Sequence, residues 1–370
     1  MVATKINQIK AKLLERGLDA LVVTKPLDIY FLANVKKFLN LVELKPTMII
    51  TANQQFILGD PVTIKVLKEL SRLDFVYITV ENREFLNHGG IYLENLIEIL
   101  NQNHCRKIGV DSWNMELKLH EKFNTYPSEN LISYYAMLKD DQQISLLKKA
   151  SGILIECFNK SLNFIQDGIT ELEMRNFFDL NIHNLGADRL GVPTIIAFGP
   201  EALAVDPVPT QRSIMPGQLA MIEISAGVET EAPLMGRTFF YDKPDSKSEK
   251  ILSKLLKVYQ KLHQNIQPGK LSSSVYDQVY KNLDNLAPYL NGICGYGLGA
   301  SSDFFYIAPH SNHVFRSKEA CVTSLSLGIP DLGVIRFTDT VLVGEPLEIL
   351  TDYPYQLILP ASPEAKHEQN

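Results

Sequence analysis

The acidic residues in the second half of this 370-residue sequence are the first candidates for chemistry. Asp206, Glu223 and Asp303 carry carboxylates that could exchange protons with a substrate. If the three faced one another in one cleft, the pKa of at least one would rise, because like charges close together resist ionising together. A carboxyl group of that kind could act as a general acid or base near neutral pH.

Cationic and phenolic side chains add binding chemistry. Arg237 and Arg336 carry guanidinium groups that could hold a substrate carboxylate through paired hydrogen bonds. Tyr296 stands between two glycines in GYGLG, where its hydroxyl could donate to a developing oxyanion. The structural alternative for the two arginines is pairing with Asp339 and Glu223 as ion pairs.

The other polar candidates belong to loops. Asp206 precedes Pro207 and could simply shape a turn, and Asp303 could cap a loop ahead of an aromatic run. His310 and His313 are three residues apart in IAPHSNHV, so they could hold a metal or supply a substitute base. Histidines on a polar loop are more often solvated.

Two regions of different pattern must position these residues. Residues 1–138 alternate helix and strand, which indicates an α/β layer with a mostly parallel or mixed sheet. Long helices and mostly antiparallel strand candidates follow from about residue 139, which indicates an α+β domain. We therefore predict a domain at 1–138, a second at 139–360 and a flexible tail at 361–370. In the first domain the expected segments are the strands Asp19–Val23, Thr47–Thr51, Gln55–Leu58, Val76–Thr79 and Lys107–Val110 and the helix Leu93–Gln102.

The helices of the second domain have recognisable starts. A stripe of apolar residues predicts a helix over Gln142–Gln166. Thr170 followed three residues later by Glu173 is typical of a capping box that opens the next helix. Ser246 and Glu249 have the same spacing and predict the start of a third helix.

The stretch Gly217–Asp242, GQLAMIEISAGVETEAPLMGRTFFYD, is typical of two strands joined by a turn. It resembles the central hairpin of the pita-bread family, which includes creatinase, aminopeptidase P, prolidase and methionine aminopeptidase. Four more segments follow the family's order: LKDDQQISLLKKAS, IIAFGPEALAVDPVPT, GYGLGASSDFF and LSLGIPDLGVIRFTDTVLVGEPLEILT. The first half resembles the family's N-terminal domain more weakly, through its element order and LDIYFLANV. The resemblance implies an α/β N-terminal domain plus an α+β pita-bread C-terminal domain of the creatinase/aminopeptidase type.

The resemblance also locates the positions at which metal-dependent members bind two divalent ions through two aspartates, one histidine and two glutamates. In this sequence those positions hold Glu223, Leu234, Tyr296, Ser326 and Thr338. Only Glu223 keeps a carboxylate, whereas a two-metal site needs several anionic oxygens. The family's proton-transferring histidines fall on Asp206 and Asp303. We therefore expect no metal ion and no other cofactor.

The scaffold glycines and the Arg-Thr-Phe tail are kept while the ligand positions have changed. We therefore predict a metal-independent enzyme acting on a small polar C–N compound, most simply as a hydrolase, with a lyase or cyclisation reaction as a variant. The candidate catalytic residues are Glu223, Asp303, Asp206 and Tyr296. The candidate substrate-binding residues are Arg237, Arg336, His310, His313, Ser326 and Thr338.

Two other functions remain open. One is a catalytically inactive pita-bread pseudoenzyme that binds a peptide or protein partner, and the other is an Xaa-Pro aminopeptidase or dipeptidase. An enzyme should have a closed pocket with a perturbed carboxyl group, and a binding module should have an open groove lined by ordinary surface charges.

Composition and charge limit the classes of binding partner that we expect. The net charge of −6 is spread without long runs of one sign, which argues against nucleic acid. The sequence has no run of about 18 consecutive apolar residues, the length that a membrane span requires, and its N-terminus lacks a secretion signal. We therefore expect a cytoplasmic protein. The expected partner is a small-molecule substrate. The resemblance implies a homodimer. Four well-separated cysteines are predicted to be buried thiols: Cys105, Cys157, Cys294 and Cys321.

Overall fold

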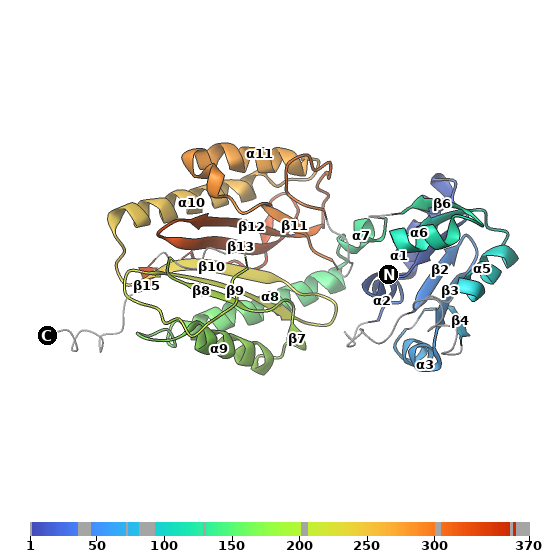
Figure 1. Ribbon diagram of the computed structural model, residues 1–370, viewed down its shortest axis with the longest axis horizontal. Coiled ribbons are helices and arrows are strands. Elements are labelled where there is room, and N and C mark those ends of the chain that lie inside the picture. The colour runs from blue at the N-terminus through green and yellow to red at the C-terminus, as the bar shows by residue number, and fades with distance from the viewer. Residues whose placement is uncertain are drawn as a thin grey trace. The chain divides into compact units, whose positions relative to one another are not determined.

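The computed structural model describes residues 2–35, 46–71, 73–80, 93–128, 131–200, 206–299, 305–355 and 358–359. The chain divides into two compact units, each with its own sheet (Figure 1). The first unit comprises Met1–Met137 with Gly299–Phe304, and the second comprises Leu138–Leu298 with Phe305–Asn370. The fold is an α/β N-terminal domain followed by an α+β pita-bread domain.

The first unit is built on a mixed sheet. Its strand order is β4 (Val76–Thr79), β3 (Gln55–Gly59), β2 (Thr47–Thr51), β1 (Ala20–Val23), β5 (Lys107–Val110) and β6 (Asn124–Pro127). The pairs β3–β4, β1–β5 and β5–β6 are parallel, and the pairs on either side of β2 are antiparallel. The predicted strands β2, β4 and β5 and the predicted helix α5 have the bounds that the sequence suggested. The helices among its described residues are α1 (Val2–Glu15), α2 (Pro26–Leu32), α3 (Pro61–Leu70), α5 (Leu93–Gln102), α6 (Trp113–Leu119) and α7 (Leu131–Ala136).

Alternation along β1 explains why this sheet is covered on both faces. Leu21 and Val23 belong to an apolar core with α1, α2 and α7, whereas Ala20 and Val22 belong to a second core with α5 and α6. Successive side chains of a strand point to opposite faces, so a fully apolar strand needs helices on both sides.

The second unit contains the larger sheet. Its main path runs β11 (Gly295–Gly297), β12 (Ala320–Ile329), β13 (Gly333–Leu342), β10 (Leu234–Tyr241), β9 (Leu219–Gly227) and β7 (Arg189–Leu190). Three further strands pair with members of this path: β8 (Ile195–Phe198) with β9, β14 (Glu348–Ile349) with β13, and β15 (Ile358–Leu359) with β10. The pairings are antiparallel except β10–β15. The sequence-predicted hairpin of Gly217–Asp242 is the pair β9–β10.

Two helix pairs pack on this sheet (Figure 1). They are α8 (Asp141–Ser161) with α9 (Glu171–Asn184), and α10 (Ser246–Asn265) with α11 (Ser272–Leu283), followed by the 3-10 helix η1 (Asp284–Tyr289). Apolar residues of β12 and β13 such as Leu325 and Phe337 share a core with α10 and α11. Their chain neighbours Ser326 and Arg336 therefore point to the opposite face of the sheet.

The helix starts follow the capping chemistry. The capping box of Thr170 and Glu173 is confirmed, because each side chain bonds the other residue's backbone N–H. The third helix does begin at Ser246, but its N-cap is Asp245, whose carboxylate accepts from two backbone N–H groups. The helix predicted over Gln142–Gln166 is α8, and it ends at Ser161. Ile165 keeps the apolar pattern because it contacts the same core from the turn that follows the helix.

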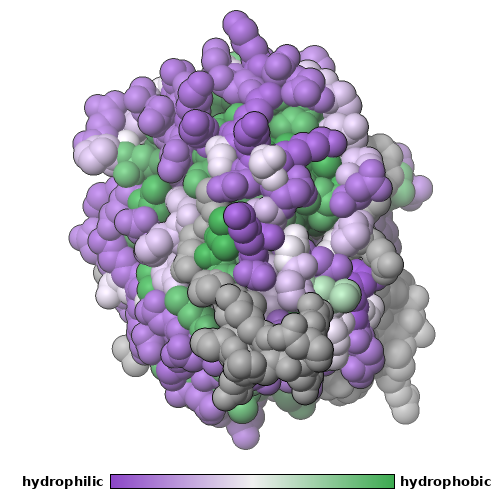
Figure 2. Space-filling view, turned by 90° about the vertical axis from the view of Figure 1, so that its left-hand side faces the viewer, coloured by the Kyte–Doolittle hydropathy of each residue, from purple (hydrophilic) through white to green (hydrophobic). Residues whose placement is uncertain are grey.

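All four cysteines are buried, as predicted. Within the described ranges no helix combines the length and apolar character that crossing a bilayer requires. On the face displayed in Figure 2 the described residues are mostly hydrophilic, with small separate apolar areas between them.

Candidate functional site

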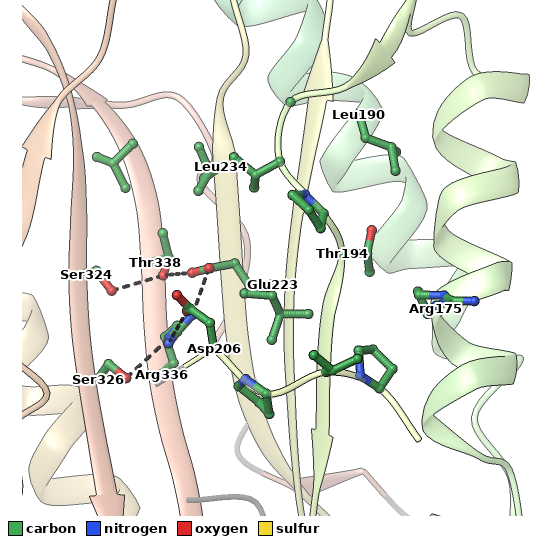
Figure 3. A pocket seen from close by; sticks show the side chains of 18 of the residues that line it. Arg175, Leu190, Thr194, Asp206, Glu223, Leu234, Ser324, Ser326, Arg336 and Thr338 are labelled. Carbon is green, nitrogen blue, oxygen red and sulfur yellow. Dashed lines mark hydrogen bonds and ion pairs between the residues drawn. The ribbon is translucent and has the colours of Figure 1, made fainter. Parts of the chain in front are cut away.

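A cavity of about 930 Å³ lies on the face of the large sheet that points away from α10 and α11. Side chains from β9, β10, β12 and β13 form its floor, and residues 190–195 and 206–209 form its walls (Figure 3). All of these residues belong to the second unit. The alternation of the strands therefore turns one set of their side chains into core and the other set into pocket.

Three residues form a row across the floor. Glu223 of β9 and Thr338 of β13 both pair in register with Gly236 of the strand between them. The hydroxyl of Thr338 donates to Oε2 of Glu223 across this glycine, with an O–O distance of 2.5 Å. A Cβ atom on Gly236 would lie 2.8 Å from Oγ1 of Thr338 and 3.2 Å from Oε2 of Glu223. The absence of a side chain at Gly236 is therefore what leaves room for this bond.

A buried guanidinium is the electrostatic centre of the pocket. Nη1 of Arg336 lies 2.9 Å from Oε1 of Glu223, and its Nε donates to Oγ of Ser326 at 3.3 Å. Nη2 of Arg336 lies 3.1 Å from Oδ1 of Asp206 on the pocket rim (Figure 3). Arg336 is 4% exposed and Glu223 is 7% exposed. The two carboxylates thus lie on either side of a cation, which compensates their like charges.

Hydroxyl and amide groups line the rest of the polar half. Tyr296 of β11 faces the pocket, and burial raises the pKa of its phenol, with the negative charge of Glu223 as a smaller cause. Tyr296 therefore keeps its proton at neutral pH and can donate a hydrogen bond. Ser324 lies 3.3 Å from the Thr338 hydroxyl, and Asn291 donates to Ser326 at 3.3 Å.

The other half of the cavity is apolar. Leu234 is two residues from Gly236 on β10 and so lies on the same face, one row further along. It packs in a cluster with Val322, Val192 and Tyr296. The pocket thus offers a charged and hydroxylated half next to an apolar half, which is the usual composition of a small-molecule site.

Two family profiles match the chain. The profile of metallopeptidase family M24 matches residues 145–345, more than half of the sequence. The chain belongs to family M24. The profile of the creatinase/prolidase N-terminal domain matches residues 5–140. The two profiles thus match consecutive parts of this M24 protein.

Curated relatives are distant and carry peptidase names. An uncharacterized peptidase of Staphylococcus epidermidis is 22% identical over 361 residues, 95% of this chain and 99% of that protein. An uncharacterized peptidase of Staphylococcus saprophyticus is 23% identical over 212 residues, which are 56% of this chain and 60% of that relative's length.

Solved structures agree in fold across the chain. Dipeptidase PepE of Mycobacterium ulcerans matches with a TM-score of 0.86 and 18% identity, covering 97% of this chain and 98% of that one. An Xaa-Pro dipeptidase of Bacillus anthracis matches with a TM-score of 0.83 and 18% identity, covering 97% and 99%. The N-terminal domain of a FACT complex subunit from Cicer arietinum matches with a TM-score of 0.79 and 14% identity, covering 98% and 99%. At these identities the likeness shows the fold alone.

The residues of this M24 protein do not fit the family's two-metal site. All five ligand positions do line the cavity: Glu223, Leu234, Tyr296, Ser326 and Thr338. Only Glu223 offers a carboxylate, and both of its oxygens already accept hydrogen bonds, from Arg336 and Thr338. No three His, Cys, Asp or Glu side chains come together as a metal site within the described part of the chain. Glu223 and Asp206 both pair with the guanidinium of Arg336, and a guanidinium is a donor for anions and carbonyl oxygens rather than a ligand for divalent cations.

Six of the sequence-predicted site residues meet in the cavity: Asp206, Glu223, Tyr296, Ser326, Arg336 and Thr338. Arg237 is not among the residues that line the cavity, so the prediction that it binds substrate there is wrong. It is buried, forms an ion pair with Asp339 at 2.9 Å and donates to backbone carbonyl groups. Arg237 follows Gly236 on β10 and therefore points to the other face of the sheet.

The loop candidates also lie elsewhere. His310 is exposed on a turn with a φ of 60°, outside the cavity lining. His313 is held by Glu319 at an Nε2–Oε2 distance of 2.9 Å, and its ring stacks on Phe305 at 3.7 Å. The prediction that the pair acts in the site is therefore wrong for both. Asp303 lies outside the described residues.

Sequence reasoning missed several pocket residues. Ser324 could have been found, because it is two residues before Ser326 on the same strand and strand residues two apart share a face. Gly236 gave no such signal, since its importance depends on the register of three strands. Arg175, Asp179 and Thr194 line the far wall, where the hydroxyl of Thr194 donates to Asp179 at 2.5 Å.

Proposed function

We propose that this M24 protein is a metal-independent enzyme that acts on a C–N bond of a small polar compound, most simply by hydrolysis. The observation that carries the proposal is the buried pair of Arg336 and Glu223 at the floor of a 930 Å³ cavity that the family's ligand positions also line. Membership of a hydrolase family and the peptidase names of the relatives support the hydrolytic class.

Fixed donors can stabilise the negative charge that develops when water attacks a carbonyl or amidine carbon. The guanidinium of Arg336 is buried and held by Glu223 and Ser326, so it need not reorganise during the reaction. The phenol of Tyr296 is protonated at neutral pH, since its ordinary pKa of about 10 is raised further by burial. Together they supply a preorganised oxyanion site of the kind that contributes strongly to acyl-transfer catalysis.

Glu223 is the group that can handle protons. Its oxygens accept from Arg336 and Thr338, and a carboxylate has about four acceptor positions in all. In the proposed reaction Glu223 takes a proton from the attacking water and returns it to the leaving nitrogen. Thr338 positions the carboxylate and does not itself react.

The second candidate function is binding without catalysis. Arg336 pairs directly with Glu223 at 2.9 Å, and such a buried ion pair can serve a structural role without catalysis. The fold likeness to a FACT complex subunit extends over nearly the whole chain. An Xaa-Pro peptidase is the third candidate, and the donor set of the cavity argues against it.

The proposal is tested by turnover in protein treated with a chelator. Amides, N-acylated amino acids and guanidino compounds are incubated with the enzyme, and the released amine is measured. We expect Glu223→Gln to lower kcat/KM by about 10²-fold or more and Tyr296→Phe by about 10²-fold, as for loss of a general base and of an oxyanion donor. Glu156→Gln, on the exposed side of α8, is the matched control and should leave kcat/KM unchanged.

The same assay separates the three functions. Turnover that appears only after manganese, cobalt or zinc is added would show that the metal-independent mechanism is wrong. Tight binding of peptides without release of amine from any compound would favour the binding module. Thermal melting of each variant shows whether Glu223→Gln acts through the reaction or through unfolding.

A further inference from the structure

We infer that the pocket takes the carboxylate of a small organic acid at Arg336, and that Asp206 competes with the ligand for this position. The inference rests on the proposed function only in using the same cavity as the small-molecule site. It names the class of ligand and identifies a residue of the chain itself that sets the affinity.

The three nitrogens of the guanidinium have partners of very different burial. Nη1 and Nε bond to Glu223 and Ser326, which are 7% and 5% exposed. Nη2 pairs with Asp206, whose side chain is 69% exposed. Two sides of the guanidinium are thus held by buried residues of the sheet, and the third is met by a residue of the rim.

An exposed ion pair is the one that a ligand can replace. The desolvated Arg336 benefits from an anion at Nη2, and Asp206 supplies a carboxylate there at 3.1 Å. Because the Asp206 side chain remains largely in water, its pairing contributes little and it can return to solvent at small cost. A ligand carboxylate would make the same charge-assisted hydrogen bond from inside the cavity.

The segment that carries Asp206 keeps this carboxylate close enough to Arg336 to compete with a ligand. Asp206 is followed by Pro207, Val208 and Pro209, and all four line the cavity. Two prolines restrict the backbone of this segment, which keeps Asp206 near the rim. The effective concentration of this internal carboxylate is therefore high, and weak carboxylate ligands are discriminated against.

The apolar half of the cavity restricts the ligand further. Ile195 pairs in register with Glu223. Leu234 lies one row further along the floor, about 7 Å from the row of Glu223. A carboxylate at Arg336 would place an attached alkyl chain against these two side chains. The expected ligands are small organic acids with an apolar chain of a few carbons, rather than strongly charged polyanions.

Binding of hexanoate and hexanamide tests this inference, because the two compounds have nearly the same shape and only the first carries a charge. Calorimetric titration of the full-length protein should detect hexanoate binding and weaker or no hexanamide binding. Asp206→Asn should tighten hexanoate binding by about three- to fivefold, the range expected when an exposed carboxylate stops competing. Asp167→Asn removes the same charge from an exposed turn and should change nothing.

Each result bears on the inference in one direction. Unchanged or weaker hexanoate binding in Asp206→Asn, equal binding of hexanamide, or no hexanoate binding at all would overturn it. Asp206 is exposed, so loss of folding is not expected to obscure the result. If Asp206→Asn tightens hexanoate but no C–N compound is turned over, the ligand class stands and the proposed reaction fails. If neutral amides are turned over and Asp206→Asn has no effect on carboxylates, the reaction stands and this inference fails.

Discussion

At Gly236, the absence of a side chain allows the hydrogen bond between Glu223 and Thr338 on the two neighbouring strands. Glu223 can bond both Arg336 and Thr338 only because nothing projects from the strand between them. A methyl group at Gly236 would meet Thr338 first, at distances of 2.8 and 2.9 Å from its Oγ1 and Cβ atoms. Since β13 is buried, Thr338 has little freedom to move aside.

The substitution Gly236→Ala tests whether the missing side chain at this position is required for the bond between Glu223 and Thr338. We expect it to destabilise the fold by about 1–3 kcal/mol, as overpacking of a close-packed site usually does, and to weaken both turnover and hexanoate binding. Urea unfolding and the two assays above measure these effects. Gly152→Ala is the control: no atom lies within 4 Å of its added Cβ on α8, so it should stabilise by about 0.5–1 kcal/mol. Normal stability and activity in Gly236→Ala would contradict the geometric role.

At the scale of elements, α10 and the back of the sheet enclose a second polar network beneath the pocket. Tyr259 of α10 donates to Asp339 of β13 at 3.0 Å, and Asp339 pairs with Arg237 at 2.9 Å. His263, one turn along α10, lies 2.9 Å from the hydroxyl of Thr323 on β12. These bonds join a helix to the strands whose other face forms the pocket, which supports a rigid floor.

His263 makes this network sensitive to pH. Burial lowers the pKa of His263, and Arg237 lowers it further, against the opposing effect of Asp339 and Asp352. The unfolded chain binds a proton at His263 with a pKa of about 6.5, whereas the folded protein does so only at lower pH. Stability from this group is therefore complete above about pH 6.5 and falls as the pH drops towards the folded-state pKa.

Chemical unfolding between pH 5 and pH 8 checks this prediction. The free energy of unfolding of the wild-type protein should decrease below about pH 6.5 more steeply than that of His263→Gln. His183→Gln, at an exposed position of α9, controls for removal of a histidine and should keep the wild-type slope. Equal slopes in wild type and His263→Gln would show that burial of this histidine does not couple folding to protons.

At the scale of the whole molecule, the chain joins a creatinase-type N-terminal domain to an M24 domain that holds the described lining residues of the cavity. We propose that the protein forms a homodimer, as its resemblance to creatinase and prolidase implies. Light scattering on the purified protein should give a mass of about twice the 41.7 kDa of one chain. A mass of one chain across the micromolar concentration range would contradict the proposal.

Much of this architecture could be predicted because it depends on local patterns. The strands β2, β4 and β5 and the helix α5 of the first domain were predicted from local pattern, and the start of α9 follows from the Thr170–Glu173 pair. The end of α8 could not, because Ile165 keeps the apolar period while leaving the helix. Motif order located Glu223, Tyr296, Ser326 and Thr338, which all line the pocket.

The sequence by itself determined the family, the order of elements and the loss of the metal-ligand side chains, since these are properties of residue type and spacing. Tertiary structure alone decided which charged groups share the pocket. Arg237 and Arg336 look equivalent in the sequence, but strand register turns Arg336 into the cavity and Arg237 into the core on the other face. Only the folded sheet places Arg336 between Glu223 and Asp206, because the segments that carry them are far apart in the chain. The electrostatics of the site therefore come from strand pairing rather than from any single motif.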